Sequence, residues 1–175
     1  MWKVIGVSLF WGIVGGQECG SKRQATASST SSSGQDLYIQ IVRTGCYGRC
    51  PIDRVELLPE GVVRYHGERF VPRLGTYTRR LSPQELKRAK ELLRAGKFEA
   101  YAEVYDNPGI SDLPSIILVY RLDGREKKIT CRTGCPPELP EKIEQLRTFL
   151  AEEGNFQMEK GPDTEEETLK DPGHD

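Results

Sequence analysis

The chain has 175 residues, of which 37% are hydrophobic and 29% are charged, and its formal net charge is −1. These values are typical of one globular domain with tails. They exclude the strong basic excess that marks many nucleic-acid-binding proteins, and we expect no nucleic-acid partner.

Residues 1–19 have the features of an export signal. A short flank with Lys3 precedes an uncharged apolar run from Val4 to Gly16, which is typical of a signal peptide and too short to span a bilayer as a helix. The alternative is a buried element of the domain, but a Ser/Thr-rich stretch at residues 20–35 separates the run from everything downstream. We predict that this stretch is a flexible linker.

Two cleavage positions remain open for this signal. Residues 25–27 have the A-x-A form that signal peptidase cuts. Cys19 is the odd one of five cysteines, and its context resembles a bacterial lipoprotein precursor in which this residue would carry the lipid and tether the domain to a membrane. Glu18 departs from that pattern, because lipoprotein signals have a small residue before the cysteine. Either version places the protein in the periplasm or cell envelope.

The first half of the predicted domain, residues 36–153, is typical of an antiparallel meander. Leu37 to Arg43 alternates between two faces and predicts a strand. Residues 52–58 and 62–66 flank a Pro-Glu-Gly turn and predict a hairpin, and residues 69–78 continue as another extended stretch.

The second half combines a hairpin with two helices. Ser82 as N-cap, Pro83 at the first helical position and Glu85 in a capping box predict a helix that ends near Gly96. Residues 115–122 and 126–132 flank an Asp-Gly turn, which is a strong hairpin signal. The last helix begins near Pro137 and places its leucines and an isoleucine on one face.

Together these elements predict an α+β domain. It has a small antiparallel sheet, made of the meander plus the hairpin, with two α-helices packed on one face in the order β-β-β-β-α-β-β-α. Residues 154–175 are acidic, contain Pro and Gly and are poor in apolar residues, so we predict a disordered tail.

Two cysteine pairs are the most informative motif of the chain. Cys46 with Cys50 and Cys131 with Cys135 share the C-x3-C spacing, an internal glycine and a following proline. In an exported protein disulfides are expected, because the compartment is oxidising. Four cysteines allow three pairings, and the residues leave all three open.

Three segments of the chain form recognisable motifs: Cys46-Tyr47-Gly48-Arg49-Cys50-Pro51, Gly61-Val62-Val63-Arg64-Tyr65-His66-Gly67 and Ser111-Asp112-Leu113-Pro114-Ser115. They resemble an uncharacterised family of bacterial, often exported, proteins that carry the domain of unknown function 6438. The resemblance implies a similar small α+β domain with no established activity. The second cysteine pair lies outside the family's pattern, which implies that the first pair exists without it and favours the bridges Cys46 to Cys50 and Cys131 to Cys135.

Two other chemistries compete for the same four cysteines. As thiolates, Cys46, Cys50, Cys131 and Cys135 could complete a tetrahedral zinc site, although C-x2-C is the more usual spacing. Thiol-disulfide redox is the other alternative, because Cys135 lies at the start of the final helix, whose dipole lowers the pKa of a thiol. The three-residue spacer differs from that of thioredoxin-like motifs.

Three arginines form a candidate ligand site. Strand alternation places Arg69, Arg73 and Arg79 on one side of an extended stretch, where they could bind a phosphate, a carboxylate or an acidic partner. The alternative is an exposed strand face whose charges discourage aggregation. His66 has no evident catalytic partner in the sequence.

Oxygen-bearing residues near Asn107 do not match a calcium loop, because Asp106, Asn107, Ser111 and Asp112 lack the spacing of an EF-hand.

Taken together, these features of the sequence predict a non-enzymatic, exported binding or structural module stapled by disulfides and without a cofactor. An envelope protein or an anionic ligand is the expected partner.

Overall fold

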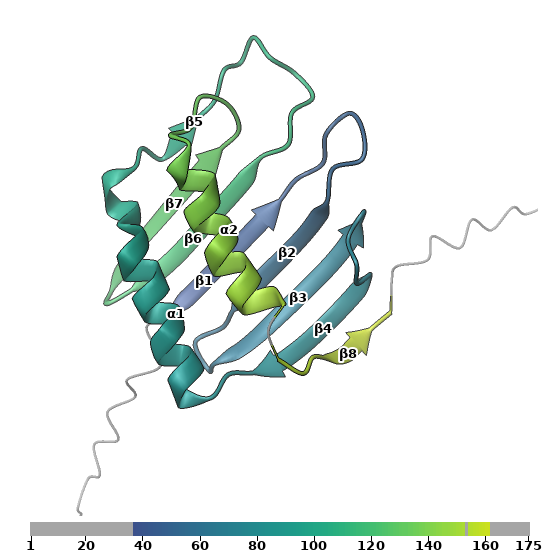
Figure 1. Ribbon diagram of the computed structural model, residues 1–175, viewed down its shortest axis with the longest axis vertical. Coiled ribbons are helices and arrows are strands. Elements are labelled where there is room, and N and C mark those ends of the chain that lie inside the picture. The colour runs from purple at the N-terminus through teal and green to yellow at the C-terminus, as the bar shows by residue number, and fades with distance from the viewer. Residues whose placement is uncertain (1–36, 153, 162–175) are drawn as a thin grey trace, which may run out of the picture. The chain divides into compact units, whose positions relative to one another are not determined.

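The computed structural model describes residues 37–152 and 154–161, which form one sheet with two helices packed on the same face (Figure 1). This arrangement confirms the predicted α+β class. The strands are β1 (Tyr38–Arg43), β2 (Ile52–Leu57), β3 (Val62–Arg69), β4 (Gly75–Arg80), β5 (Val104–Tyr105), β6 (Ile116–Leu122), β7 (Arg125–Cys131) and β8 (Gln157–Lys160), and the helices are α1 (Pro83–Gly96) and α2 (Glu138–Ala151), with a 3-10 turn at Phe98–Ala100.

Strand β1 joins the two halves of the sheet. The strand order is β5-β7-β6-β1-β2-β3-β4-β8, and every neighbouring pair is antiparallel except β5 with β7. Strand β1 pairs with β2 on one side and with β6 on the other. The meander and the hairpin predicted from the sequence are therefore parts of one continuous sheet.

The hydrophobic core lies between the sheet and the helices. Ile39 and Ile41 of β1, with Val55 and Leu57 of β2, point to the helical side and are buried there. Leu146 lies among the buried residues of α2. Because side chains alternate along a strand, the residues between these apolar ones point to the face that the two helices leave uncovered.

Helix α1 begins at the predicted capping box. The Glu85 backbone N–H donates to the Ser82 hydroxyl at 3.3 Å, and the Ser82 backbone N–H donates to the Glu85 carboxylate at 2.7 Å. The same carboxylate accepts a hydrogen bond from the buried guanidinium of Arg79 at 2.7 Å. Glu85 therefore joins the start of α1 to strand β4.

The extended stretch predicted at residues 69–78 is divided in two. Strand β3 ends at Arg69 and β4 begins at Gly75, and the chain turns between them with Phe70 at a φ of 55°. Gly67 and Gly75 face each other in the register, so the two strands form a hairpin instead of one long strand.

Part of the segment predicted as a disordered tail is ordered. Residues 157–160 form β8, which pairs with the edge of β4. The apolar side chain just before it explains this order: Phe156 packs edge-on against Tyr65, with ring centroids 6.5 Å apart, and two arginines lie over its ring. Residues 162–175 lie outside the described residues.

The predicted signal at residues 1–19, the linker at 20–35 and both cleavage positions also lie outside the described residues. Within the described part of the chain, neither helix is long and apolar enough to cross a membrane.

The capping box makes the stability of the fold depend on pH in the acid range. The hydrogen bond from the Ser82 backbone, with that from Arg79, lowers the pKa of Glu85 from 4.5 to about 2. A carboxylate with a depressed pKa stabilises the folded state above its unfolded pKa, and this contribution is lost as the pH falls from about 4.5 to about 2. We predict that Glu85→Gln lowers the free energy of unfolding at pH 7 by about 1 to 2 kcal/mol, a value reduced for solvent screening.

Urea denaturation between pH 7 and pH 2 measures this effect. The difference between the wild type and Glu85→Gln should shrink across that acid window and vanish at its lower end. A difference that stays constant with pH would contradict the assignment.

Candidate functional site

Four loops meet at one end of the sheet, which we call the disulfide end. They are residues 44–51, 70–74, 106–115 and 132–137. The register explains the meeting, because the last residue of β1, Arg43, lies opposite Asp53 of β2 and Ile116 of β6, and Ile116 lies opposite Cys131 of β7. Figure 1 shows three of these loops together above the sheet.

Each of two loops is closed by a local disulfide. Cys46 is bonded to Cys50 and Cys131 to Cys135, and the Cα atoms are 5.8 Å apart in both pairs. These are the pairings that the family resemblance favoured. Gly134, within the second ring, has a φ of 69°, a backbone conformation that glycine adopts without strain.

The two disulfides argue against the zinc alternative. A sulfur in a disulfide is not the thiolate that zinc requires. Among the described residues, no three His, Cys, Asp or Glu side chains are grouped as metal ligands would be.

Hydrogen bonds connect the loops to one another. The Thr44 backbone N–H donates to the Ser115 carbonyl at 3.0 Å, and the Tyr47 N–H donates to the Asp112 carbonyl at 3.3 Å. Arg132 forms an ion pair with an oxygen of Asp106 at 3.5 Å. Three of the four loops of the disulfide end therefore fix one another's positions.

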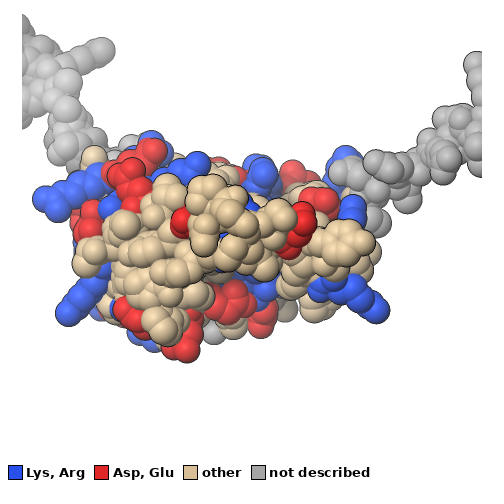
Figure 2. Space-filling model, turned by 90° about the horizontal axis from the view of Figure 1, so that it is seen from above, with Lys and Arg blue, Asp and Glu red and all other residues tan. Residues whose placement is uncertain are grey.

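The disulfide end exposes large apolar side chains. Tyr47 is 93% exposed at the tip of the first disulfide loop. Most of the exposed large apolar residues in the described chain belong to these four loops: Tyr47, Phe70, Leu74, Ile110 and Leu113. Figure 2, which looks down on this end, shows a broad area with few charged side chains and more charges around its margin.

A hollow of about 530 Å³ lies between the two disulfides, and we call it the apolar hollow. Its lining consists largely of prolines, an isoleucine and one cysteine from each bridge, together with charged side chains. The apolar lining residues are Cys50, Pro51, Pro114, Ile116, Cys131 and Pro140, and the charged ones are Arg43, Arg132, Glu141 and Glu144.

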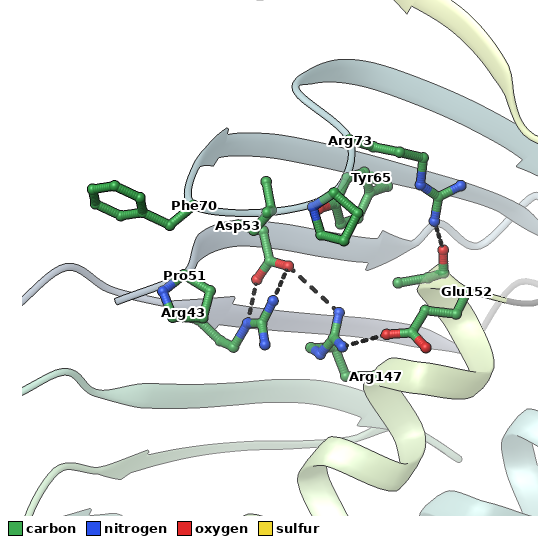
Figure 3. A pocket seen from close by; sticks show the side chains of 11 residues that line it. Arg43, Pro51, Asp53, Tyr65, Phe70, Arg73, Arg147 and Glu152 are labelled. Atoms are coloured by element: carbon green, nitrogen blue, oxygen red, sulfur yellow. Dashed lines mark hydrogen bonds and ion pairs between the residues drawn. The ribbon is translucent and has the colours of Figure 1, made fainter. Parts of the chain in front are cut away.

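A second hollow, of about 430 Å³, lies beside the C-terminal end of α2, and we call it the charged pocket (Figure 3). Arg43 and Pro51 line both hollows. The remaining residues of the charged pocket are Asp53, Tyr65, Phe70, Val71, Pro72, Arg73, Arg147, Ala151 and Glu152.

The carboxylate of Asp53 forms the floor of the charged pocket. It continues the inward row of Val55 and Leu57 on β2, and its side chain is only 2% exposed. Arg43 of β1 binds it with two N–H groups, the Nε atom at 2.7 Å from Oδ1, and Arg147 of α2 reaches Oδ2 at 3.4 Å. Figure 3 shows Asp53 with a guanidinium group from each of these elements.

Arg147 is itself surrounded by carboxylates. Its Nε atom lies 2.8 Å from Glu144, and its Nη2 atom lies 2.8 Å from Glu152. Burial acts to lower the pKa of Arg147, but the hydrogen bond and charge of Glu144, with the charge of Asp53, outweigh it and hold the pKa above its ordinary value. Arg147 therefore stays a cation inside the domain.

Tyr65 forms part of the pocket wall as a neutral phenol. Burial, with the negative charge of Asp53 as the next cause, raises the pKa of Tyr65 to about 12. Arg73 lies over the ring of Tyr65 at 5.1 Å and donates a hydrogen bond to the Ala151 carbonyl near the end of α2. The phenol hydroxyl therefore keeps its proton at neutral pH.

The three arginines proposed from the sequence do not form one exposed face. Arg79 is buried and binds Glu85 and the Phe149 carbonyl, whereas Arg69 is exposed at the end of β3. Arg73 lines the charged pocket. The prediction of a shared face assumed a continuous strand, and the turn at residues 70–74 breaks its alternation.

The other candidate residues have local roles in the structure. The Nδ1 atom of His66 lies 3.0 Å from the Thr76 hydroxyl, across the pair of β3 and β4. The Asn107 side chain accepts a hydrogen bond from the Gly109 N–H, as in a turn, and the Ser111 hydroxyl donates to the Asp112 carboxylate.

The sequence analysis missed the central residues of the charged pocket, which are Arg43, Asp53 and Arg147. One signal could have found the carboxylate. Asp53 occupies an inward position of a strand whose other inward residues are Val55 and Leu57, and a charged residue on the buried face of a strand is rare unless it is paired.

The match to a family model agrees with the resemblance in sequence. The model of the domain of unknown function 6438 matches residues 37–150, so the chain belongs to this family. No curated protein matches the chain.

We predict that the Asp53 carboxylate is needed for stability. Asp53→Asn leaves two arginines, one of them buried, without their shared counter-charge, and removal of one partner from a buried ion pair costs about 3 kcal/mol or more. Chemical denaturation at neutral pH measures the loss. The matched control is Asp123→Asn, whose exposed carboxylate pairs with Arg94 and whose loss should cost less than about 1 kcal/mol. Equal losses in the two variants would contradict the prediction.

Proposed function

We propose that this member of the family with the domain of unknown function 6438 is an exported, non-enzymatic binding module that docks an envelope protein through its disulfide end. The observation that carries the proposal is the gathering of exposed apolar side chains on loops held by two disulfides. Contiguous apolar surface rimmed by polar residues is typical of protein-binding sites.

The apolar hollow supports docking by a single anchoring side chain. Its lining is mostly apolar and also includes the charged residues Arg43, Arg132, Glu141 and Glu144. Binding energy in protein interfaces is concentrated in side chains that fill such pockets, surrounded by a polar rim. Tyr47 and Leu113 are exposed on two of the loops that line this hollow. They would pack against the partner around its anchoring side chain.

The rigidity of the loops favours binding as well. Ordering a flexible loop on association costs free energy, and a loop that is already fixed avoids this cost. Here both disulfides and the hydrogen bonds of Thr44 and Tyr47 hold the loops before any partner arrives.

Export is the second part of the proposal. Disulfides form and persist in oxidising compartments, and the apolar run before the linker is typical of an export signal. We therefore place the mature domain in the periplasm or cell envelope of a bacterium, either free or anchored by lipid on Cys19.

The intact mass of the protein recovered from bacterial cells tests export. We predict a chain shortened after Ala27, or at Cys19 with added lipid, whose mass rises with an alkylating reagent only after the two disulfides are reduced. An unshortened chain that is alkylated without reduction at Cys19 and at all four cysteines of the two pairs would contradict export and favour the zinc alternative.

Photo-crosslinking in cells tests docking. A photoreactive residue in place of Tyr47 or Leu113 should give one adduct of defined mass with another protein. The matched control replaces Lys87 on α1, which is 80% exposed and far from the loops in sequence, and should give no such adduct. An adduct of equal yield from the control position, or none from the loops, would contradict the proposed surface.

A further inference from the structure

We propose that the charged pocket is a separate binding site for a neutral saccharide. The ligand would lie between the paired charges on the pocket floor and an apolar rim that includes Phe70. This inference goes beyond docking at the disulfide end and does not require it.

The pairing of charges on the pocket floor argues against an ionic ligand there. Asp53 is paired with Arg43 and Arg147, and Arg147 also binds Glu152. Arg73, at the far end of the pocket, donates to the Ala151 carbonyl and lies over the rings of Tyr65 and Phe156. An anion or cation on the floor would have to displace a charged partner and leave a poorly solvated charge unpaired, which is costly. A neutral ligand leaves these pairs intact.

The more exposed members of these pairs, Arg43 and Glu152, keep spare hydrogen-bonding capacity, and the 2%-exposed Asp53 holds Arg43 in place. An ionised carboxylate can accept about four hydrogen bonds and a guanidinium can donate five. Asp53 accepts from two N–H groups of Arg43 and from Arg147, while Nη1 of Arg43 lies 3.8 Å from the nearest oxygen of Glu144. Rigid donors and acceptors side by side suit adjacent sugar hydroxyls, because each hydroxyl both donates and accepts.

The rim of the pocket offers a surface for the apolar face of a sugar ring. Phe70 is 44% exposed, and the exposed prolines Pro51 and Pro72 line the same hollow. Figure 3 shows Phe70 and Pro51 toward one end of the pocket, Arg73 and Glu152 at the other, and Asp53 between them. The C–H groups of a sugar ring pack on aromatic and proline rings, while its hydroxyls reach the paired charges.

The backbone of Phe70 gives independent support. Its φ of 55° lies in the left-handed region, which a bulky residue such as phenylalanine rarely adopts. Residues in such conformations cluster at binding sites. The guanidinium of Arg49 lies over the ring at 5.5 Å and helps to hold it at the rim.

Nuclear magnetic resonance titration of the disulfide-bonded chain tests the site. The probes are glucose, N-acetylglucosamine and their linear trimers, with acetate, phosphate and glycine as ionic comparisons. We expect a saccharide to shift the signals of Tyr65, Phe70 and Arg73, whereas the ions leave them unchanged. Binding of the monomers identifies a free sugar as the ligand, and binding of the trimers alone identifies a polysaccharide.

Phe70→Asn removes the ring and supplies a residue that adopts a positive φ more readily. We expect it to weaken saccharide binding about tenfold or more without lowering Tm, and Phe70→Tyr to keep binding. The matched control, Val104→Asn, replaces an exposed apolar residue on β5 at the edge of the sheet and should leave binding unchanged.

The proposal is overturned if no saccharide shifts these signals, if the ions bind as well as the sugars, or if Phe70→Asn binds as the wild type does. Docking of a protein at the disulfide end is measured separately, by crosslinks from Tyr47 and Leu113. The docking proposal and the saccharide proposal can therefore fail independently.

Discussion

The buried carboxylate of Asp53 is the interaction on which the arrangement of the site depends. It binds arginines from β1 and from α2, and so connects two neighbouring strands to the helix that covers them. Ions taken from water are expensive to bury, and good pairing is what makes the burial tolerable. Arg43 also lines the apolar hollow, so this one carboxylate holds a side chain that belongs to both hollows.

The loops of the disulfide end are held in place by a different set of interactions. These loops expose side chains such as Tyr47 and Leu113, so burial of apolar surface contributes little to holding them. Local bridges and hydrogen bonds between loops replace the missing core as constraints. The result is apolar surface in fixed positions, which is the property that separates a binding surface from a merely mobile loop.

Two differences between prediction and structure share a cause. The turn at Phe70 carries no glycine at its positive φ and interrupts a stretch whose composition suits a strand. The strand β8 lies at the start of the acidic segment 154–175, and its order depends on contacts of Phe156 with Tyr65 of β3, Arg79 of β4 and Arg73 of the turn between these strands. In both places contacts between distant residues outweigh local preference.

Most elements of the fold and the spacing of the bridges could be predicted from the sequence, because these depend on neighbours along the chain. Alternation indicated the strands, the Ser82 to Glu85 box indicated the start of α1, and Asp-Gly indicated the hairpin of β6 and β7. Which charges meet is visible in the folded domain alone. Asp53 and Arg147 are 94 residues apart, and alternation fixes the face on which a side chain lies but not the partner it finds there.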